Sequence, residues 1–262
     1  MSGTPAKPPA NGVAKPPANR VVLVTGAARG MGHATARGFL AAGDRVAVAD
    51  VDAAALREAW PDAAADLVLP VVFDVADPTG AAAGVAKVLG HFGRVDVLVN
   101  NAALHGASWT GPCLELAPEQ WTRLLAVNVL GIVNVTRAAA DALSESSGVV
   151  INVSSMTAYG HGPSSGYAVT KAAVNGLTTS LAEELGRSGV RVVGVAPGFI
   201  ATDTVLAALP ADRPDAIVRL QSLPVRGTAE DIAAVIAFLA SPAARLIAGQ
   251  TVVADAGITR RP

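Results

Sequence analysis

Residues 20–43 read RVVLVTGAARGMGHATARGFLAAG. The opening apolar run predicts a buried strand, the glycines at Gly26, Gly30 and Gly32 predict a tight turn, and the Ala-rich remainder predicts a helix. Glycine lets the backbone approach a pyrophosphate closely, and the helix that follows offers free N–H groups and its positive dipole end to an anion. The stretch therefore favours a dinucleotide-binding turn over a turn that needs glycine only for its shape.

Strand-like and helix-like segments alternate along the rest of the chain. The alternation predicts an α/β fold with a single doubly wound, Rossmann-type parallel sheet and helices on both faces. In such a sheet the ligand site lies at the carboxyl ends of the strands. Polar or turn-forming residues fall at or just past the expected strand ends: Thr25, Asp50, Asp74-Val75, Asn100-Asn101, Ser154 and Pro197-Gly198.

Asp50 ends the second strand, RVAVAD, eighteen residues after Gly32. An acidic residue at this distance is placed to hydrogen-bond the adenosine ribose hydroxyls. The alternative is a helix N-cap. Because Asp52 directly precedes the helical AAALREAW, it is the better candidate for the cap, and we assign the ribose role to Asp50.

Tyr167 and Lys171 lie four residues apart in YAVTK, within an Ala-rich segment that predicts a helix through about Leu185. That spacing places both side chains on one helix face. A nearby ammonium favours the phenolate and would lower the pKa of the tyrosine toward neutrality, which suits acid–base catalysis. Ser154, thirteen residues before Tyr167 at the end of GVVINVS, could hydrogen-bond the same reacting oxygen.

Composition limits the classes of function. The 262 residues are 51% hydrophobic and 16% charged, with net charge −1 and no basic block, which argues against a nucleic-acid or anionic-membrane partner. We expect no segment of membrane-spanning length. The one cysteine, Cys113, excludes an internal disulfide and fits a reducing, cytoplasmic location. The four histidines show no metal-ligand spacing.

Two parts of the chain depart from the strand–helix alternation. Residues 1–19 contain AKPPAN twice and predict a disordered Pro-rich tail, so the folded domain is expected at 20–262. Residues 203–222 are interrupted by Pro210 and Pro214 and predict a helical flap over the site.

Over residues 20–258 the sequence resembles the short-chain dehydrogenase/reductase family. The resemblance rests on Asp50, Asp74-Val75, Asn128, Ser154 and on five motifs in order: TGAARGMG at 25–32, NNAA at 100–103, YAVTK at 167–171, PGFIAT at 197–202 and GQTVVADAG at 249–257. It implies an NAD-dependent oxidoreductase that interconverts a secondary alcohol and a ketone. It departs from the family at Ala103 and Ala256, where glycine is usual, so Ala103 must adopt an ordinary backbone conformation.

The resemblance also implies residue roles. The catalytic residues would be Asn128, Ser154, Tyr167 and Lys171, with Asn128 helping to position a proton-relay water. Lys171 would bind the nicotinamide ribose, Thr202 would touch the nicotinamide amide, and Asp74-Val75 would contact the adenine. The expected cofactor-binding set is Gly26, Arg29, Gly30, Met31, Gly32, Asp50, Val51, Asp74, Val75, Asn101, Ala102, Tyr167, Lys171, Pro197, Gly198, Ile200 and Thr202.

Cofactor choice is contested between two residues. Asp50 favours NAD, whereas an arginine at the position of Arg29 is often seen in family members that prefer NADP. Arg29 could instead pair with Asp50 and hold it in place. We expect NAD, and an NADPH-dependent 3-oxoacyl-thioester reductase is the rival within the family.

Two rivals belong to other classes. A non-catalytic dinucleotide sensor would need no Tyr-Lys pair, and a Rossmann-like methyltransferase binds a ligand without a pyrophosphate. The expected partner is a small apolar or cyclic ketone or alcohol in a pocket formed by Leu104, Trp109, Met156, Tyr159, His161, Leu206 and Leu209. The resemblance implies a homotetramer packed through helices near 118–143 and 167–186 and the C-terminal strand.

Overall fold

The structure is a computed structural model that describes residues 19–61, 66–109, 111–160, 165–202, 205–206 and 213–259. The expected Pro-rich tail before Asn19, much of the expected flap, and the pocket candidates His161 and Leu209 lie outside these ranges.

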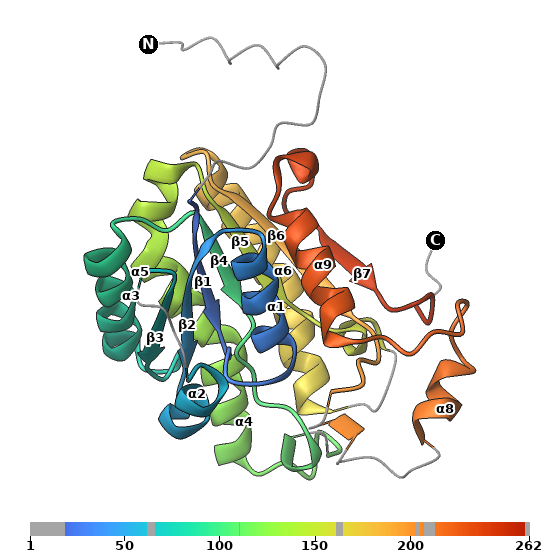
Figure 1. The fold of residues 1–262 in the computed structure, drawn as a ribbon. Coiled ribbons are helices and arrows are strands. Elements are labelled where there is room, and N and C mark those ends of the chain that lie inside the picture. The colour runs from blue at the N-terminus through green and yellow to red at the C-terminus, as the bar shows by residue number, and fades with distance from the viewer. Residues whose placement is uncertain are drawn as a thin grey trace.

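The described residues form one seven-stranded parallel sheet in the order β3-β2-β1-β4-β5-β6-β7 (Figure 1). From β1 the chain adds β2 and β3 on one side, and then returns to add β4 to β7 on the other side of β1. The direction in which strands are added to the sheet therefore reverses between β1 and β4. This reversal opens a crevice at the carboxyl ends of the strands. The predicted fold class is confirmed, with strands β1 Val21–Thr25, β2 Arg45–Asp50, β3 Val68–Val72, β4 Val97–Asn100, β5 Val149–Val153, β6 Arg191–Pro197 and β7 Thr251–Ala254.

One strand ends earlier than the sequence indicated. The apolar run DLVLPVVFDV predicts a strand through Asp74-Val75, but β3 ends at Val72. Asp74 instead begins a turn, because its Oδ1 accepts the Ala76 N–H at 2.9 Å and its carbonyl accepts the Asp77 N–H at 3.1 Å. Asp74 and Val75 still lie beyond the carboxyl end of the strand.

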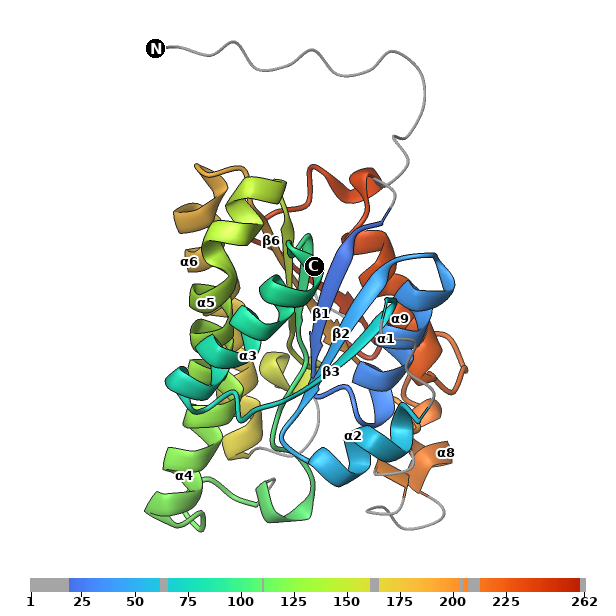
Figure 2. The same cartoon turned by 60° about the vertical axis from the view of Figure 1, so that its left-hand side comes forward.

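Helices cover both faces of the sheet (Figure 2). One layer contains α3, α5 and α6, and the other contains α1, α2 and α9. The helices are α1 Gly30–Ala41, α2 Ala53–Ala59, α3 Pro78–Phe92, α4 Pro118–Leu125, a π-helical turn Ala126–Leu130, α5 Gly131–Ser146, α6 Gly166–Gly186, α8 Arg213–Val218 and α9 Ala229–Leu239.

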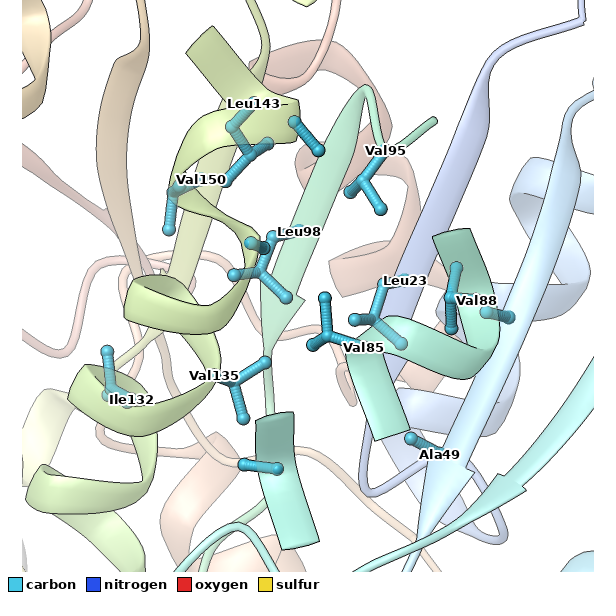
Figure 3. Close-up of a cluster of buried hydrophobic side chains, with 14 of the residues drawn as sticks. Leu23, Ala49, Val85, Val88, Val95, Leu98, Ile132, Val135, Leu143 and Val150 are labelled. Carbon is cyan, nitrogen blue, oxygen red and sulfur yellow. The ribbon is translucent and has the colours of Figure 1, made fainter. Parts of the chain in front are cut away.

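The two faces of each strand feed two separate cores. In β1, Val21 and Leu23 pack with α3 and α5, while Val22 and Val24 pack with α1 and α9. This is the period-2 alternation of a strand buried on both faces. Figure 3 shows the first core, where valines and leucines of α3 and α5 converge on β1 and β4.

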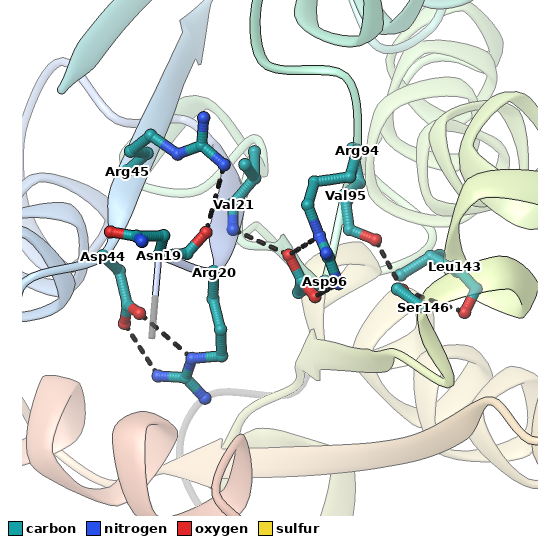
Figure 4. Close-up of polar contacts among 10 residues, drawn as sticks. All are labelled: Asn19, Arg20, Val21, Asp44, Arg45, Arg94, Val95, Asp96, Leu143 and Ser146. Atoms are coloured by element: carbon teal, nitrogen blue, oxygen red, sulfur yellow. Dashed lines mark hydrogen bonds and ion pairs between the residues drawn. The ribbon is translucent and has the colours of Figure 1, made fainter. Parts of the chain in front are cut away.

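The amino ends of the strands are fixed by one buried and one half-buried ion pair on the side of the sheet away from the crevice (Figure 4). Arg20 pairs with Asp44 at 2.7 Å, and Arg94 pairs with Asp96 at 2.6 Å. Asp96 also accepts the Val21 N–H at 2.8 Å, which ties the start of β1 to the start of β4. These contacts hold together the two strands between which the crevice opens.

Residues Pro118–Ser146 form one continuous 29-residue helix through α4, the π turn and α5. Contrary to the sequence expectation, this helix is long and apolar enough by composition to cross a membrane, and it is the one such helix within the described ranges. Its apolar residues Ile132, Val135 and Leu143 are buried in the core against the sheet. The helix therefore packs as a core helix.

Two alanines replace glycines that the family usually has. Ala103 has no positive φ, as its substitution requires, whereas Ala256 sits in the left-handed region at φ 52°. That conformation favours glycine, which explains the family preference at position 256.

The packing of α3 on β3 yields a stability prediction. A Cβ on Gly84 would collide with the buried ring of Phe73, whereas a Cβ on Gly90 of the same helix would meet nothing within 4 Å. Alanine improves helix propensity by about 1 kcal/mol at either site, but overpacking typically costs about 1–3 kcal/mol. We expect Gly84→Ala to lower the melting temperature and Gly90→Ala to raise it by about 2–4 °C.

Circular dichroism melting curves of both variants provide the measurement. Equal increases in the two melting temperatures would show that the Phe73 ring moves aside without cost.

Candidate active site

A cleft of about 640 Å³ lies at the carboxyl ends of the strands. In Figure 1 this is the edge of the sheet near α4 and α8. Of the expected catalytic residues, the cleft is lined by Ser154, Tyr167 and Lys171; Asn128 lies behind it. Gly32 is the one residue of the expected cofactor set that does not line it. Leu104 and Met156 of the expected substrate pocket line it, whereas Trp109, Tyr159 and Leu206 do not.

The turn after β1 is packed too tightly for side chains. A Cβ on Gly32 would collide with the Gly26 carbonyl oxygen and lie 2.5 Å from Asn101 Nδ2. Gly26 has φ 67°, and a Cβ there would lie 2.9 Å from Ala102 Cα. Gly32 is thus required for the close packing of the turn, and its contact with the cofactor stays a prediction.

Hydrogen bonds join this turn to the end of β4. Asn101 Nδ2 donates to the carbonyls of Thr25 and Gly26 at 2.9 and 3.1 Å. Thr25 Oγ1 accepts the N–H groups of Asn101 and Ala102 at 3.1 and 3.2 Å. Trp60, which the sequence analysis did not single out, donates its indole N–H to the Ala27 carbonyl at 3.1 Å. Hydrogen bonds of Asn101, Thr25 and Trp60 consequently hold the turn in place.

These features fit the phosphates of a dinucleotide. No side chain caps the amino end of α1 and no acidic residue stands in its first turn, so its free N–H groups and positive dipole end are open to an anion. Gly30 and Met31, the first residues of α1, line the cleft. No group of three His, Cys, Asp or Glu side chains suited to a metal ion occurs among the residues that the structure describes.

Asp50 lines the cleft at the end of β2, and its carboxylate is fixed by the backbone. Oδ2 accepts the Ala28 N–H at 3.0 Å and Oδ1 accepts the Asp52 N–H at 3.1 Å. Arg29 pairs with Asp52 at 3.1 Å, so the expected alternative of an Arg29–Asp50 pair is wrong. Asp52 also caps α2 as predicted, and the Ala55 N–H and then Arg29 lower the pKa of its carboxyl.

Asp74 faces the same part of the cleft from the turn after β3. Arg123 of α4 pairs with Asp74 at 2.8 Å and also lines the cleft. No pattern in the sequence indicated that Arg123 would reach this site. Burial acts to raise the pKa of Asp74, but hydrogen bonds from the Ala76 N–H and Arg123 outweigh it and hold the pKa below its ordinary value. Asp74 is therefore a carboxylate at neutral pH.

Asn128 connects three elements around the site from within the π turn. Its Oδ1 accepts the Leu104 N–H at 2.7 Å, and its Nδ2 donates to the Leu104 carbonyl at 3.1 Å and to Thr170 Oγ1 at 3.0 Å. Thr170 donates in turn to the Tyr167 carbonyl at 2.8 Å. This buried asparagine thus joins the loop after β4 to the helix that carries Tyr167.

Tyr167 and Lys171 share one face of α6, as their spacing predicted. Lys171 Nζ lies 5.6 Å from the centroid of the Tyr167 ring and donates to the Val153 carbonyl at 2.7 Å. Ser154, at the end of β5, donates its hydroxyl to the Lys171 carbonyl at 3.0 Å. Strand β5 and helix α6 therefore bring all three side chains to the same end of the cleft.

Burial dominates the protonation of this pair. It raises the pKa of Tyr167 to about 12, against a hydrogen bond from the Ser155 side chain that lowers it. It also lowers the pKa of Lys171 to about 8. The expectation that Lys171 draws the pKa of the tyrosine toward neutrality is not met in this structure, where burial of the hydroxyl is the larger effect.

Three further residues of this region escaped the sequence analysis. Ser155 and Thr157 line the cleft beside Tyr167, and the only sequence signal was a second serine after Ser154. His105 lines the cleft from the loop after β4, and burial followed by the charge of Lys171 lowers its pKa.

Comparisons with known proteins agree with this geometry. The family model for Enoyl-(Acyl carrier protein) reductase matches residues 26–259. The 2-(R)-hydroxypropyl-CoM dehydrogenase of Xanthobacter autotrophicus is 39% identical over 92% of this chain and 98% of the relative. The 3-oxoacyl-[acyl-carrier-protein] reductase of Thermotoga maritima is 35% identical over 91% of this chain and 97% of the relative.

A solved structure is similar over the whole fold. The 7α-hydroxysteroid dehydrogenase in complex with NADH and 7-oxo glycochenodeoxycholic acid superimposes with a TM-score of 0.84, at 27% identity, over 92% of this chain and 94% of that chain. The range matched by the family model, residues 26–259, includes both the glycine turn and the Tyr-Lys helix. The chain belongs to the short-chain dehydrogenase/reductase family of oxidoreductases, whose members bind a nicotinamide dinucleotide.

Proposed function

We propose that the protein is an NAD-dependent oxidoreductase that interconverts a secondary alcohol and a ketone, with Tyr167 as the general acid and base. The observation that carries the proposal is the convergence of Ser154, Tyr167 and Lys171 on a cleft whose other end is an uncapped helix terminus behind a glycine turn. A bound nicotinamide dinucleotide would supply the hydride donor or acceptor.

The protein side chains have separate tasks. Tyr167 gives its hydroxyl proton to the ketone oxygen in reduction and takes a proton from the alcohol in oxidation. Ser154 turns its hydroxyl from the Lys171 carbonyl toward the reacting oxygen and stabilises charge that develops there. Lys171 holds positive charge near the Tyr167 ring and would bind the nicotinamide ribose. Asn128 fixes the π turn and helps to position a proton-relay water.

The opposite end of the cleft supports the choice of NAD. Asp50 and Asp74 present carboxylate oxygens whose remaining lone pairs can accept from ribose hydroxyls and from the adenine amino group. Arg29 is engaged with Asp52, so it does not neutralise Asp50. Val51, Val75, Ala102 and Ile200 line the cleft and would supply apolar surface for the cofactor, while Pro197, Gly198 and Thr202, which also line it, would hold the nicotinamide end.

We propose a small, apolar or cyclic ketone or alcohol as the substrate. The cleft around Tyr167 contains Leu104, Met156, Phe199 and Val205. Apolar walls with a few polar groups suit such a ligand. The similarity to a steroid dehydrogenase is in keeping with this class.

An NADPH-dependent 3-oxoacyl-thioester reductase is the second candidate. Arg29 at the glycine turn and the similarity to a 3-oxoacyl-[acyl-carrier-protein] reductase favour it. A non-catalytic dinucleotide sensor has no use for the buried Tyr-Lys pair. Binding of NADH without turnover on a broad ketone and alcohol panel would support the sensor.

We further propose a cytoplasmic homotetramer. The helices near 118–143 and 167–186 expose Leu125, Leu130 and Val169, which supports association through this face. The single cysteine, Cys113, is free, in keeping with a reducing compartment. Light scattering measures the assembly directly.

Tyr167→Phe provides the test of the mechanism. The substitution removes the hydroxyl and keeps the ring, so we expect turnover to fall by about 10²–10⁴ while NAD(H) binding stays within a few fold. Steady-state rates at the nicotinamide absorbance and fluorescence titration with NADH measure the two quantities. Tyr159→Phe is the matched control, because Tyr159 lies outside the cleft lining, and it should stay active. More than a tenth of the original rate in Tyr167→Phe would remove Tyr167 from the mechanism.

Cofactor choice provides a second test. The 2′-phosphate of NADP would stand near Asp50, and two unit charges about 5 Å apart at an effective dielectric near 20 repel by roughly 3 kcal/mol. We expect NAD(H) to be preferred by at least about tenfold in kcat/KM, or ~1.4 kcal/mol, and Asp50→Ala to shrink or reverse that preference. Equal or better efficiency with NADPH in the unmutated protein would instead support the thioester reductase.

Asp52→Asn separates the role of Arg29 from that of Asp50. Asparagine caps a helix as well as aspartate does, so α2 is kept while Arg29 loses its charged partner. We expect the kcat/KM for NADP(H) to rise several-fold with little change for NAD(H). An unchanged value for NADP(H) would show that pairing with Asp52 does not restrain Arg29.

A further inference from the structure

Arg123 of α4 brings a positive charge to the adenosine end of the cleft, and the proposed mechanism does not use it. Its guanidinium pairs with Asp74 Oδ2 at 2.8 Å, and both side chains line the cleft. The Arg123 side chain is 44% exposed, and an ion pair this exposed adds little to the stability of a fold. The pair is therefore better explained by the groups that it presents to a ligand.

Both members of the pair have hydrogen-bonding capacity left. Asp74 Oδ1 accepts the Ala76 N–H at 2.9 Å and Oδ2 accepts from Arg123, so each carboxylate oxygen keeps a free lone pair. The bond to Asp74 is the one hydrogen bond of the Arg123 guanidinium within the described ranges, and arginine has five N–H donors in a planar fork. A hydrogen-bond acceptor and a set of donors thus lie side by side in the cleft wall.

The other charged groups at this end of the cleft have partners or tasks of their own. Arg29 pairs with Asp52 at 3.1 Å. The two oxygens of Asp50 accept backbone N–H groups, and its remaining lone pairs are proposed to bind the ribose. Arg123 and Asp74 are therefore the charged residues available to contact the base.

Adenine has the hydrogen-bonding pattern that matches this pair. Its 6-amino group donates, and the ring nitrogens on either side of that group accept. Asp74 can accept from the amino group while Arg123 donates to a neighbouring ring nitrogen. Hypoxanthine carries a carbonyl in place of the amino group, which would set one acceptor against another at Asp74. Val51 and Val75 also line the cleft and can pack on the faces of the ring.

We propose that Arg123 and Asp74 form one donor–acceptor pair that selects adenine in the cofactor, in which Arg123 holds Asp74 in place and itself donates to the base. The inference rests on the proposed function, which places the adenosine half of the cofactor at this end of the cleft. It does not depend on the choice between NAD and NADP, since both carry adenine. Removal of Arg123 should reduce the discrimination between bases even though Asp74 remains.

Calorimetric titration with ADP and with inosine diphosphate, IDP, tests the proposal without turnover. The two ligands share the ribose and the phosphates, and they differ in the base, which is hypoxanthine in IDP. We expect ADP to bind at least about tenfold more tightly, as one matched donor–acceptor pair allows. Arg123→Met removes the guanidinium and keeps an apolar stem. It should reduce the ratio to about threefold or less by weakening ADP, with IDP nearly unchanged.

A double-mutant cycle tests whether the two residues act as a pair. Asp74→Asn keeps an oxygen for the Ala76 N–H and removes the charge that Arg123 binds. We expect Asp74→Asn to lower the ratio of ADP to IDP affinity by itself. Arg123→Met should then have a smaller effect in the Asp74→Asn background than in the original protein, because residues that act together are not additive. Additive effects would overturn the pair.

Arg226→Ala is the matched control. Arg226 forms an exposed ion pair with Asp215, as Arg123 does with Asp74, but neither Arg226 nor Asp215 lines the cleft. The ratio of ADP to IDP affinity should stay unchanged in this variant. The melting temperature of ligand-free Arg123→Met should equal that of the original protein, which separates a role in binding from a role in the fold.

The outcomes distinguish this inference from the proposed function. Equal affinities for ADP and IDP in the unmutated protein, or an unchanged ratio in folded Arg123→Met, overturn the inference. If Arg123→Met does not fold, an unchanged ratio in Arg123→Ala overturns it. A loss of affinity confined to 2′,5′-ADP would assign Arg123 to a phosphate and would overturn it too. Selection of ADP without turnover of any ketone or alcohol overturns the proposed function and leaves the adenine-selecting pair in place.

Discussion

The close approach of two backbone turns organises this molecule. The direction in which strands are added to the sheet reverses between β1 and β4, so the turn after β1 and the end of β4 meet at the crevice. Their contact leaves no room for a Cβ on Gly32. Asn101 and Thr25 then join the two turns through backbone N–H and carbonyl groups. The backbone that would receive the phosphates is therefore fixed before any ligand binds, which limits the ordering cost of binding.

A second set of contacts connects this fixed backbone to the Tyr167 end of the cleft. Asn128 binds both polar backbone groups of Leu104 and reaches Thr170, which binds the Tyr167 carbonyl. The π turn gives Asn128 its place, and π turns inside helices are frequent at functional sites. The Asn128 amide thus connects the loop after β4 to the helix that carries Tyr167 and Lys171. The two ends of the cleft are therefore held in a fixed position relative to each other.

Hydrophobic periodicity and residue spacing predicted the fold and the convergence of Ser154, Tyr167 and Lys171, because buried strands and helix faces can be recognised from neighbouring residues alone. Choices among nearby partners were not predictable. Arg29 selects Asp52 over Asp50, and Arg123 reaches Asp74 from a helix far along the chain. The apolar run through Val75 hid the end of β3, since a turn-forming aspartate within an apolar stretch leaves the periodicity intact. Trp109 and Tyr159 each end a short 3₁₀ helix beyond a strand end and do not line the cleft, which strand-end position alone did not indicate.

The protonation of Tyr167 also lay beyond the sequence, and it shapes how the site works. A cationic neighbour was expected to dominate, yet burial raises the pKa of Tyr167 to about 12 and lowers that of Lys171 to about 8. At neutral pH the tyrosine thus keeps its proton, which is the form that the proposed ketone reduction needs. Oxidation requires the phenolate, whose stabilisation must come from dipoles or from charge that arrives with a ligand. Burying another ion beside Tyr167 would cost several kcal/mol, so neutral polar groups are the less costly way to stabilise the phenolate.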